Sequence, residues 1–127
     1  MIVTKSLSYP DIKKNLKKNS KIGIVSCNAC ARMCQTGGEL KMEELGLKLK
    51  KDGFNVVDSD LIGIACDFNQ LKKNELHGDI TLVLACDSAI YNLKKLFPKR
   101  KIVPALKTLG IGAYDHKGNV FLVKKFK

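Results

Sequence analysis

The sequence predicts a three-layer α/β fold: a mostly parallel sheet with helices on both faces, and a terminal β-hairpin. Apolar runs of strand length alternate along the chain with amphipathic stretches of helical length, which is typical of a parallel sheet covered by helices. Three of the apolar runs each lead into a cysteine: Lys21–Cys27, Leu61–Cys66 and Ile80–Cys86. Further along, two short apolar segments flank a polar turn, which is typical of a hairpin.

The size and composition of the chain predict a single domain over residues 1–127. With 127 residues, the chain is long enough for one hydrophobic core but not for two. No apolar run approaches the ~20 residues that a membrane-spanning helix needs. The segment Met1–Ser8 lacks the apolar stretch of a secretory signal. We therefore expect a cytoplasmic protein with no membrane association.

The elements of the first half follow from apolar spacing and from turn residues. A short helix is predicted over Ser8–Lys18, because Pro10 suits a first helical turn. Ile22–Val25 is the first buried strand. A helix begins near Glu39 and ends at Asp52-Gly53. Its buried face is predicted to carry Met42, Leu45 and Leu49.

The second half repeats this alternation. The predicted elements are a strand at Phe54–Val57, a continuation or separate strand at Leu61–Ala65, a helix over Asp67–Leu76, a buried strand at Ile80–Ala85, a helix capped by Asp87 and Ser88 and ended by Pro98, a short strand at Lys101–Val103, and a hairpin of Ala113-Tyr114 with Val120–Val123. The last helix has the clearest apolar stripe, formed by Ala89, Ile90, Leu93, Leu96 and Phe97.

The five cysteines predict a metal centre. Cys27, Cys30 and Cys34 share one short loop, and Cys66 and Cys86 each follow an apolar run. If these runs are parallel strands of one sheet, their thiols meet at its carboxyl edge, where open α/β sheets bind ligands. Because the number of cysteines is odd and the expected compartment is reducing, metal binding is favoured over disulfides.

Thiolate ligands favour an iron–sulfur cluster or zinc. A zinc ribbon would show a second close cysteine pair, and this chain has none. The spacing therefore favours a [4Fe–4S] cluster, which takes four thiolates, with zinc as the alternative. Taken singly, Cys66 and Cys86 also fit buried, inert cysteines at strand ends. Which four of the five cysteines would bind stays open.

The charge of +11 arises from 23 Lys+Arg against 12 Asp+Glu. It is best interpreted as a solvated, lysine-rich surface, and next as a surface for an acidic protein partner or cofactor. The charge does not favour nucleic acid, because Arg32 and Arg100 are the only arginines and aromatic residues are few.

No residues are predicted to be catalytic. His77 lies beside Gly78 at a predicted helix end, and His116 lies in the hairpin turn, so both are expected to be solvated. A cysteine of the loop acting as a nucleophile is possible, but no base is fixed near it.

The run Cys27–Glu39 (CNACARMCQTGGE) resembles the cysteine loop of the methylenetetrahydrofolate reductase C-terminal-domain family, whose members include small partner subunits of the acetogen-type reductase. Val83–Cys86 and Val103–Gly110 are similar to its second half, so that the resemblance covers about Ile22 to Gly112.

The resemblance implies an iron–sulfur subunit that serves an oxidoreductase complex by electron transfer or as a structural partner, with a flavoprotein reductase as its partner. It implicates Cys27, Cys30, Cys34, Cys66 and Cys86 as the pool of ligands, without catalytic activity in the chain itself. The alternatives are a zinc-binding structural or regulatory domain without electron transfer, and an enzyme that uses a cysteine thiolate.

Overall fold

A computed structural model describes residues 1–127 as two sheets with five helices. In chain order the elements are β1 (Ile2–Ser6), α1 (Tyr9–Lys13), β2 (Lys21–Cys27), α2 (Cys30–Met33), α3 (Glu39–Lys51), β3 (Asn55–Ile62), α4 (Phe68–Lys73), β4 (Ile80–Leu84), α5 (Asp87–Leu96), β5 (Lys101–Pro104), β6 (Leu106–Tyr114) and β7 (Val120–Lys125). None of the five helices has the length and apolar character that a membrane span requires.

The larger sheet has four parallel strands in the order β3-β2-β4-β5, which confirms the predicted parallel sheet. β2 and β4 lie at its centre and are almost wholly buried, as their continuous apolar sequences require. The chain passes from β2 to β3 on one side and then returns past β2 to β4 on the other. Strand order therefore reverses between β2 and β4.

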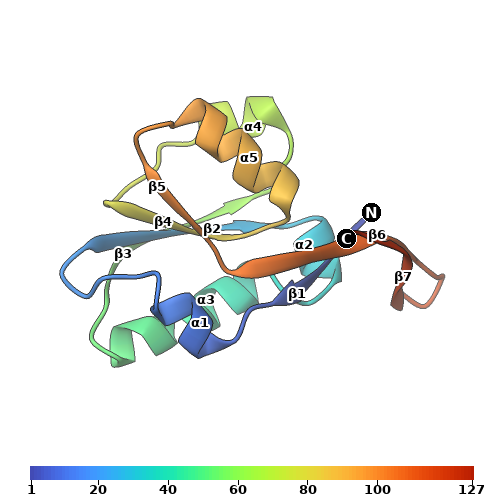
Figure 1. The fold of residues 1–127 in the computed structure, drawn as a ribbon, viewed down its shortest axis with the longest axis horizontal. Coiled ribbons are helices and arrows are strands. Elements are labelled where there is room, and N and C mark those ends of the chain that lie inside the picture. Colours follow the sequence, from blue (N-terminus) through green and yellow to red (C-terminus); the bar gives the residue numbers. More distant parts are fainter.

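Helices cover both faces of this sheet. Figure 1 shows α1 and α3 on one face and α4 and α5 on the other, so the three-layer prediction is confirmed. On α3, Met42 and Leu49 are buried while Leu45 is partly buried against the same core. On α5, Ala89, Ile90 and Leu93 are buried, and Leu96 and Phe97 pack at the edge of the core.

The second sheet has three antiparallel strands in the order β1-β6-β7. β6 and β7 form the predicted terminal hairpin, whose turn is held by Asp115, a side chain that accepts from the N–H groups of Lys117 and Asn119 at 2.9 Å. Two features were not predicted. β1 pairs with β6, and β6 begins at Leu106, well before the predicted Ala113.

Several element boundaries differ from the prediction. The two alternatives around Leu61 resolve into one long strand, β3. α4 ends at Lys73 because Asn74 is extended, so the prediction of helix to Leu76 was wrong. The N-cap of α5 is Cys86, and its side chain makes no capping hydrogen bond. Asp87 and Ser88 thus lie within the first helical turn.

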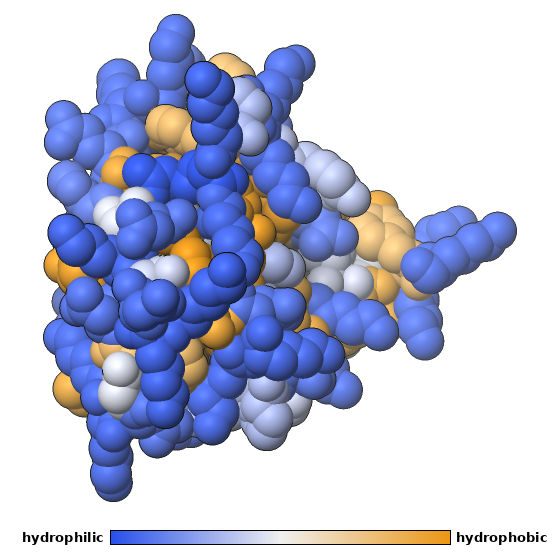
Figure 2. Space-filling model, turned by 60° about the vertical axis from the view of Figure 1, so that its left-hand side comes forward, coloured by the Kyte–Doolittle hydropathy of each residue, from blue (hydrophilic) through white to orange (hydrophobic).

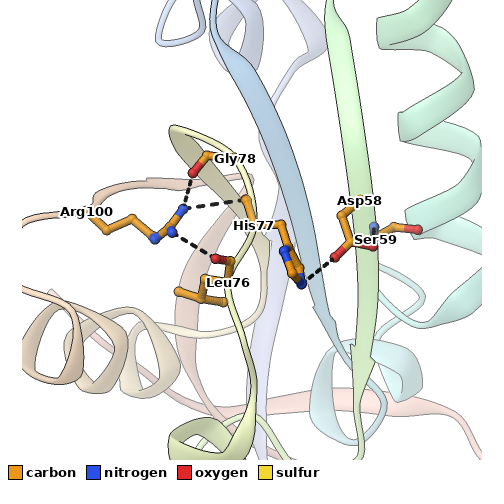
Figure 3. A network of polar contacts seen from close by, with 6 residues as sticks. All are labelled: Asp58, Ser59, Leu76, His77, Gly78 and Arg100. Atoms are coloured by element: carbon orange, nitrogen blue, oxygen red, sulfur yellow. Dashed lines mark hydrogen bonds and ion pairs between the residues drawn. The ribbon is translucent and has the colours of Figure 1, made fainter.

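A network of polar contacts closes the amino edge of the parallel sheet (Figure 3). Arg100 donates to the carbonyl oxygens of Leu76 at 2.8 Å and of Gly78, and His77 lies 3.6 Å from the Asp58 carboxylate of β3. The loop between α4 and β4 crosses β2 so closely that a Cβ on Gly23 would lie 2.5 Å from the His77 carbonyl oxygen. His77 and His116 are both exposed, as predicted.

Candidate metal centre

Cys27 and Cys86 lie on the two central strands where strand order reverses. Cys27 is the last residue of β2, and Cys86 follows β4 as the N-cap of α5. Both are buried. The carboxyl ends of the strands at such a reversal form the crevice in which open α/β sheets bind ligands. Topology therefore brings these two thiols to the position where a ligand is expected.

Cys66 reaches the same edge from the loop after β3. A turn in which the Asp67 N–H donates to the Ile64 carbonyl at 3.1 Å shapes this loop, and the Asp67 side chain then caps α4 by accepting from Asn69 N at 2.9 Å. The Asn92 side chain of α5 donates to the Cys66 carbonyl at 3.4 Å. Cys66 is exposed, so it lies on the solvent side of the group.

Burial and neighbouring thiols raise the pKa values of Cys66 and Cys86. Desolvation by the surrounding chain raises the pKa of the Cys66 thiol, although its residue is exposed, and the charges of Cys27 and Cys30 act in the same direction. Burial raises the pKa of the Cys86 thiol, with smaller contributions of the same sign from Cys66 and Cys30. Cys27, Cys30, Cys66 and Cys86 are thus linked by the influence of their charges on one another, and we call them the four-cysteine group.

Backbone N–H groups affect two of these thiols. The Ala29 N–H donates to Cys27 Sγ at 3.3 Å. The Cys86 side chain accepts no capping hydrogen bond, but the backbone N–H groups of Ala89 and Ser88, in the first turn of α5, lower the pKa of its thiol and oppose the effect of burial. These donors stabilise negative charge on sulfur, but burial outweighs them at Cys86 because the pKa is raised overall.

Cys34, the third cysteine of the loop, makes a different contact. Its Sγ donates toward the carbonyl oxygen of Ile2 in β1 at 3.8 Å. It lines a groove with Val3 and Thr4 of β1 and Gly118 of the hairpin turn. Cys34 is therefore held against the antiparallel sheet, and it is not among the thiols that raise the pKa values of Cys66 and Cys86.

The cysteine loop is pinned to the core by contacts that cysteine spacing alone does not predict. Ser26 Oγ accepts from the Gly38 N–H at 2.8 Å, and Thr36 Oγ1 lies 2.7 Å from Thr4 Oγ1 in a buried pair. Gly37 fits because a Cβ there would lie 2.7 Å from that of Ala31 and 3.1 Å from the Leu84 carbonyl oxygen. The adjacent Gly37-Gly38 was the available signal in the sequence.

Exposed apolar side chains lie close to Cys66 along the chain. Ile64 and Phe68 flank the Cys66 loop and are 46% and 41% exposed, and Leu61 at the end of β3 is 38% exposed. These side chains gain nothing from contact with water. They give the edge beside Cys66 the character of a contact surface.

No three His, Cys, Asp or Glu side chains lie in the arrangement that holds a single metal ion. Comparison of the chain with protein-family models, with curated proteins and with solved structures gave no match. The resemblance of the cysteine loop to the methylenetetrahydrofolate reductase C-terminal-domain family therefore stays a prediction, and the evidence for a function of this chain is the arrangement of its own residues.

Proposed function

We propose that this chain binds a [4Fe–4S] cluster through Cys27, Cys30, Cys66 and Cys86, and transfers electrons as a non-catalytic subunit of a redox complex. The observation that carries the proposal is the position of Cys27 and Cys86 at the ends of β2 and β4, on either side of the strand-order reversal, with Cys30 and Cys66 in the segments that follow β2 and β3. In this proposal Cys34 does not bind the cluster.

The donor set fits such a cluster. The four-cysteine group offers sulfur donors without histidine, and four cysteine thiolates are the usual ligands of a [4Fe–4S] cluster. A cluster carries its thiolates on different irons, so they lie farther apart than the thiolates of one zinc, where Zn–S bonds of about 2.3 Å bring all four together. This spacing is compatible with the lack of a single-ion arrangement.

The chain contributes binding, charge stabilisation and partial exclusion of water. Cys27 and Cys86 lie in the buried part of the edge, whereas Cys66 is exposed. The N–H group of Ala29 donates to Cys27 Sγ, and a hydrogen bond to sulfur adjusts the reduction potential of a bound cluster. A bound cluster would supply one-electron redox chemistry, and Cys66 lies on the side from which a partner would approach.

The proposed partner is a protein with a second redox centre, which the family resemblance suggests to be a flavoprotein reductase. Ile64 and Phe68 beside Cys66 offer it apolar contact. All five cysteines are free, which suits the reducing cytoplasm that we propose as the location.

The test is metal and acid-labile sulfide analysis after anaerobic purification, for the wild type and five single Cys→Ser variants. We expect about four iron and four sulfide per wild-type chain. Cys27→Ser, Cys30→Ser, Cys66→Ser and Cys86→Ser should lose or degrade the cluster, visible as loss of absorbance and of the electron paramagnetic resonance signal of the reduced protein. Cys34→Ser is the matched control and should retain both.

Two results would contradict the proposal. Bound zinc without sulfide in the wild type would indicate a structural zinc domain. Full cluster retention in both Cys66→Ser and Cys86→Ser would confine the site to the loop. If the cluster is present, reduction by a chemical donor and reoxidation by a soluble acceptor should be measured next, because a cluster that cannot cycle would only stabilise the fold.

A further inference from the structure

The outward face of the antiparallel sheet is apolar at its centre. Paired residues of neighbouring strands share a face, and the pairs Ile2↔Ile111, Ala113↔Phe121 and Ile111↔Lys124 therefore define one face of β1, β6 and β7. Leu109 and Phe126 join it, because Phe126 N donates to the Leu109 carbonyl at 2.8 Å. The apolar members are Ile2, Leu109, Ile111, Ala113, Phe121 and Phe126; we call them the outer face.

The opposite side of the same sheet is packed against the protein along β1 and the first half of β6, whereas Tyr114 and Leu122 on that side of the hairpin are 57% and 42% exposed. Val3, Thr4 and Leu106 are buried there, and Thr108 Oγ1 accepts from the Asp87 N–H at the start of α5 at 2.9 Å. The outer face has no such cover: Ile111 is 46% exposed, Phe121 51% and Phe126 42%. Figure 2 shows apolar residues beside long hydrophilic side chains on the arm that projects at the right.

Lysines border the outer face, and no acidic residue lies on its strands. Lys5 and Lys107 pair at one end of the face, and Lys124 lies on the edge strand β7. The sequences of β1, β6 and β7 contain neither Asp nor Glu. An apolar centre within a charged rim is the usual anatomy of a protein interface, here with a rim of one sign.

We infer that the outer face docks a protein whose own contact surface has an apolar centre and an acidic rim. Burial of Ile111, Phe121 and Phe126 would supply the affinity, and Lys5, Lys107 and Lys124 would orient the partner and hasten the encounter. A second copy of this chain fits poorly, because both copies would carry a charge of +11 and bring lysine to lysine. The inference goes beyond the proposed function and does not require a cluster.

The test uses the full chain and three charge variants. Phe121→Glu places an acid among the apolar side chains of the outer face, and Lys124→Glu reverses the charge beside them on β7. Lys125→Glu is the matched control, since it makes the same change on the next residue of β7 but on the opposite side of the sheet. Melting curves and iron content should be equal in all variants, which separates loss of docking from loss of fold or cluster.

Proteins retained from source-cell lysate by the tagged wild type are quantified against the three variants. We expect a protein that Lys125→Glu retains and that Phe121→Glu and Lys124→Glu lose. With this protein purified, binding should weaken at least tenfold for Lys124→Glu and should weaken with added salt. The absence of any protein with this pattern, or an equal loss with Lys125→Glu, would overturn the inference.

Two further measurements test the other possible occupants. Sedimentation of the purified chain should give a monomer, and a dimer that Phe121→Glu dissociates would assign the face to self-association. Flotation with vesicles of phosphatidylcholine and phosphatidylserine should show no binding that depends on Phe121. Binding of that kind would assign the face to a membrane surface and overturn the inference.

Discussion

The carbonyl oxygen of Ala31 organises the cysteine loop at the scale of single residues. It accepts from the N–H groups of Thr36 and Gly37, both at 2.9 Å, and from Thr36 Oγ1 at 3.1 Å. These contacts fold the chain back directly after α2 and bring Gly38 onto Ser26. Cys30 begins α2 and Cys34 is its C-cap. The orientation of both side chains therefore depends on the turn that ends this helix.

Gly37→Ala should destabilise the protein. Its Cβ would lie 2.7 Å from Ala31 Cβ and near the backbone of β4, so either the loop or the strand must move. Overpacking of this kind typically costs about 1–3 kcal/mol. Denaturant unfolding of the metal-free protein measures it, and an unchanged midpoint would show that the loop is loosely packed.

Gly46→Ala is the matched control, because its Cβ would meet only Ile24 Cδ1 at an ordinary 3.5 Å in the interior of α3. Alanine in a helix interior is favoured over glycine by about 0.5–1 kcal/mol, so this variant should be slightly more stable than the wild type.

At the scale of elements, α5 connects the core to the four-cysteine group. Its first turn donates to the carbonyl oxygen of Cys86, its Asn92 holds the Cys66 loop, and its apolar stripe packs on the parallel sheet. The position of α5 on the core therefore also sets the position of Cys86 and of the Cys66 loop. Its buried residues are therefore expected to matter for stability and for the position of Cys86 alike.

Leu93→Ala should lower the free energy of unfolding by about 2–5 kcal/mol, because a fully buried leucine leaves a cavity. Lys95→Ala, on the exposed side of the same helix, should change it by less than about 0.5 kcal/mol. Denaturant titration of both variants measures the difference. A cost below that limit for Leu93→Ala would mean that α5 does not pack on the sheet as described.

Local sequence signals predicted the elements that are specified locally. The continuous apolar run of β4 and the stripe of α5 each carry their own signature, and Asp52-Gly53 ends α3 where predicted. β1 escaped prediction because five residues of mixed character become a strand only by pairing with β6, far along the chain. The pairing of β1 with β6 is therefore specified by tertiary contact and not by local sequence.

The sequence predicted the five candidate cysteines but not which four of them would bind a cluster. Spacing placed all five cysteines near one edge of a sheet, and the parallel strands confirm that edge for Cys27 and Cys86. The separate contact of Cys34 depends on the turn after α2 and on the position of β1. Neither is encoded by cysteine spacing, so the sequence left open which thiol is spare.

At the scale of the whole molecule, the four-cysteine group joins the segments after β2, β3 and β4. A ligand that binds all four thiols would connect three of the four strands of the parallel sheet, and ligand binding to the folded state adds directly to its stability.

Removal of the proposed cluster by an iron chelator should therefore lower the thermal midpoint. Each 1 kcal/mol lost corresponds to roughly 2–8 °C for domains of about this size. Anaerobic calorimetry of the loaded and stripped protein measures this change. The stripped wild type and stripped Cys34→Ser should melt alike, and equal midpoints before and after stripping would show that no bound group connects the strands.

The pairing of β1 with β6 also has a consequence for biosynthesis. The amino group of Met1 donates to the carbonyl of Gly112, 111 positions later. At typical ribosomal speeds of about 5–20 residues per second, β1 waits on the order of 10 s for its neighbour. The outer face is assembled from β1, β6 and β7 together, so it does not exist on a nascent chain before β7 has emerged. A partner that recognises this face would select finished molecules over unfinished ones.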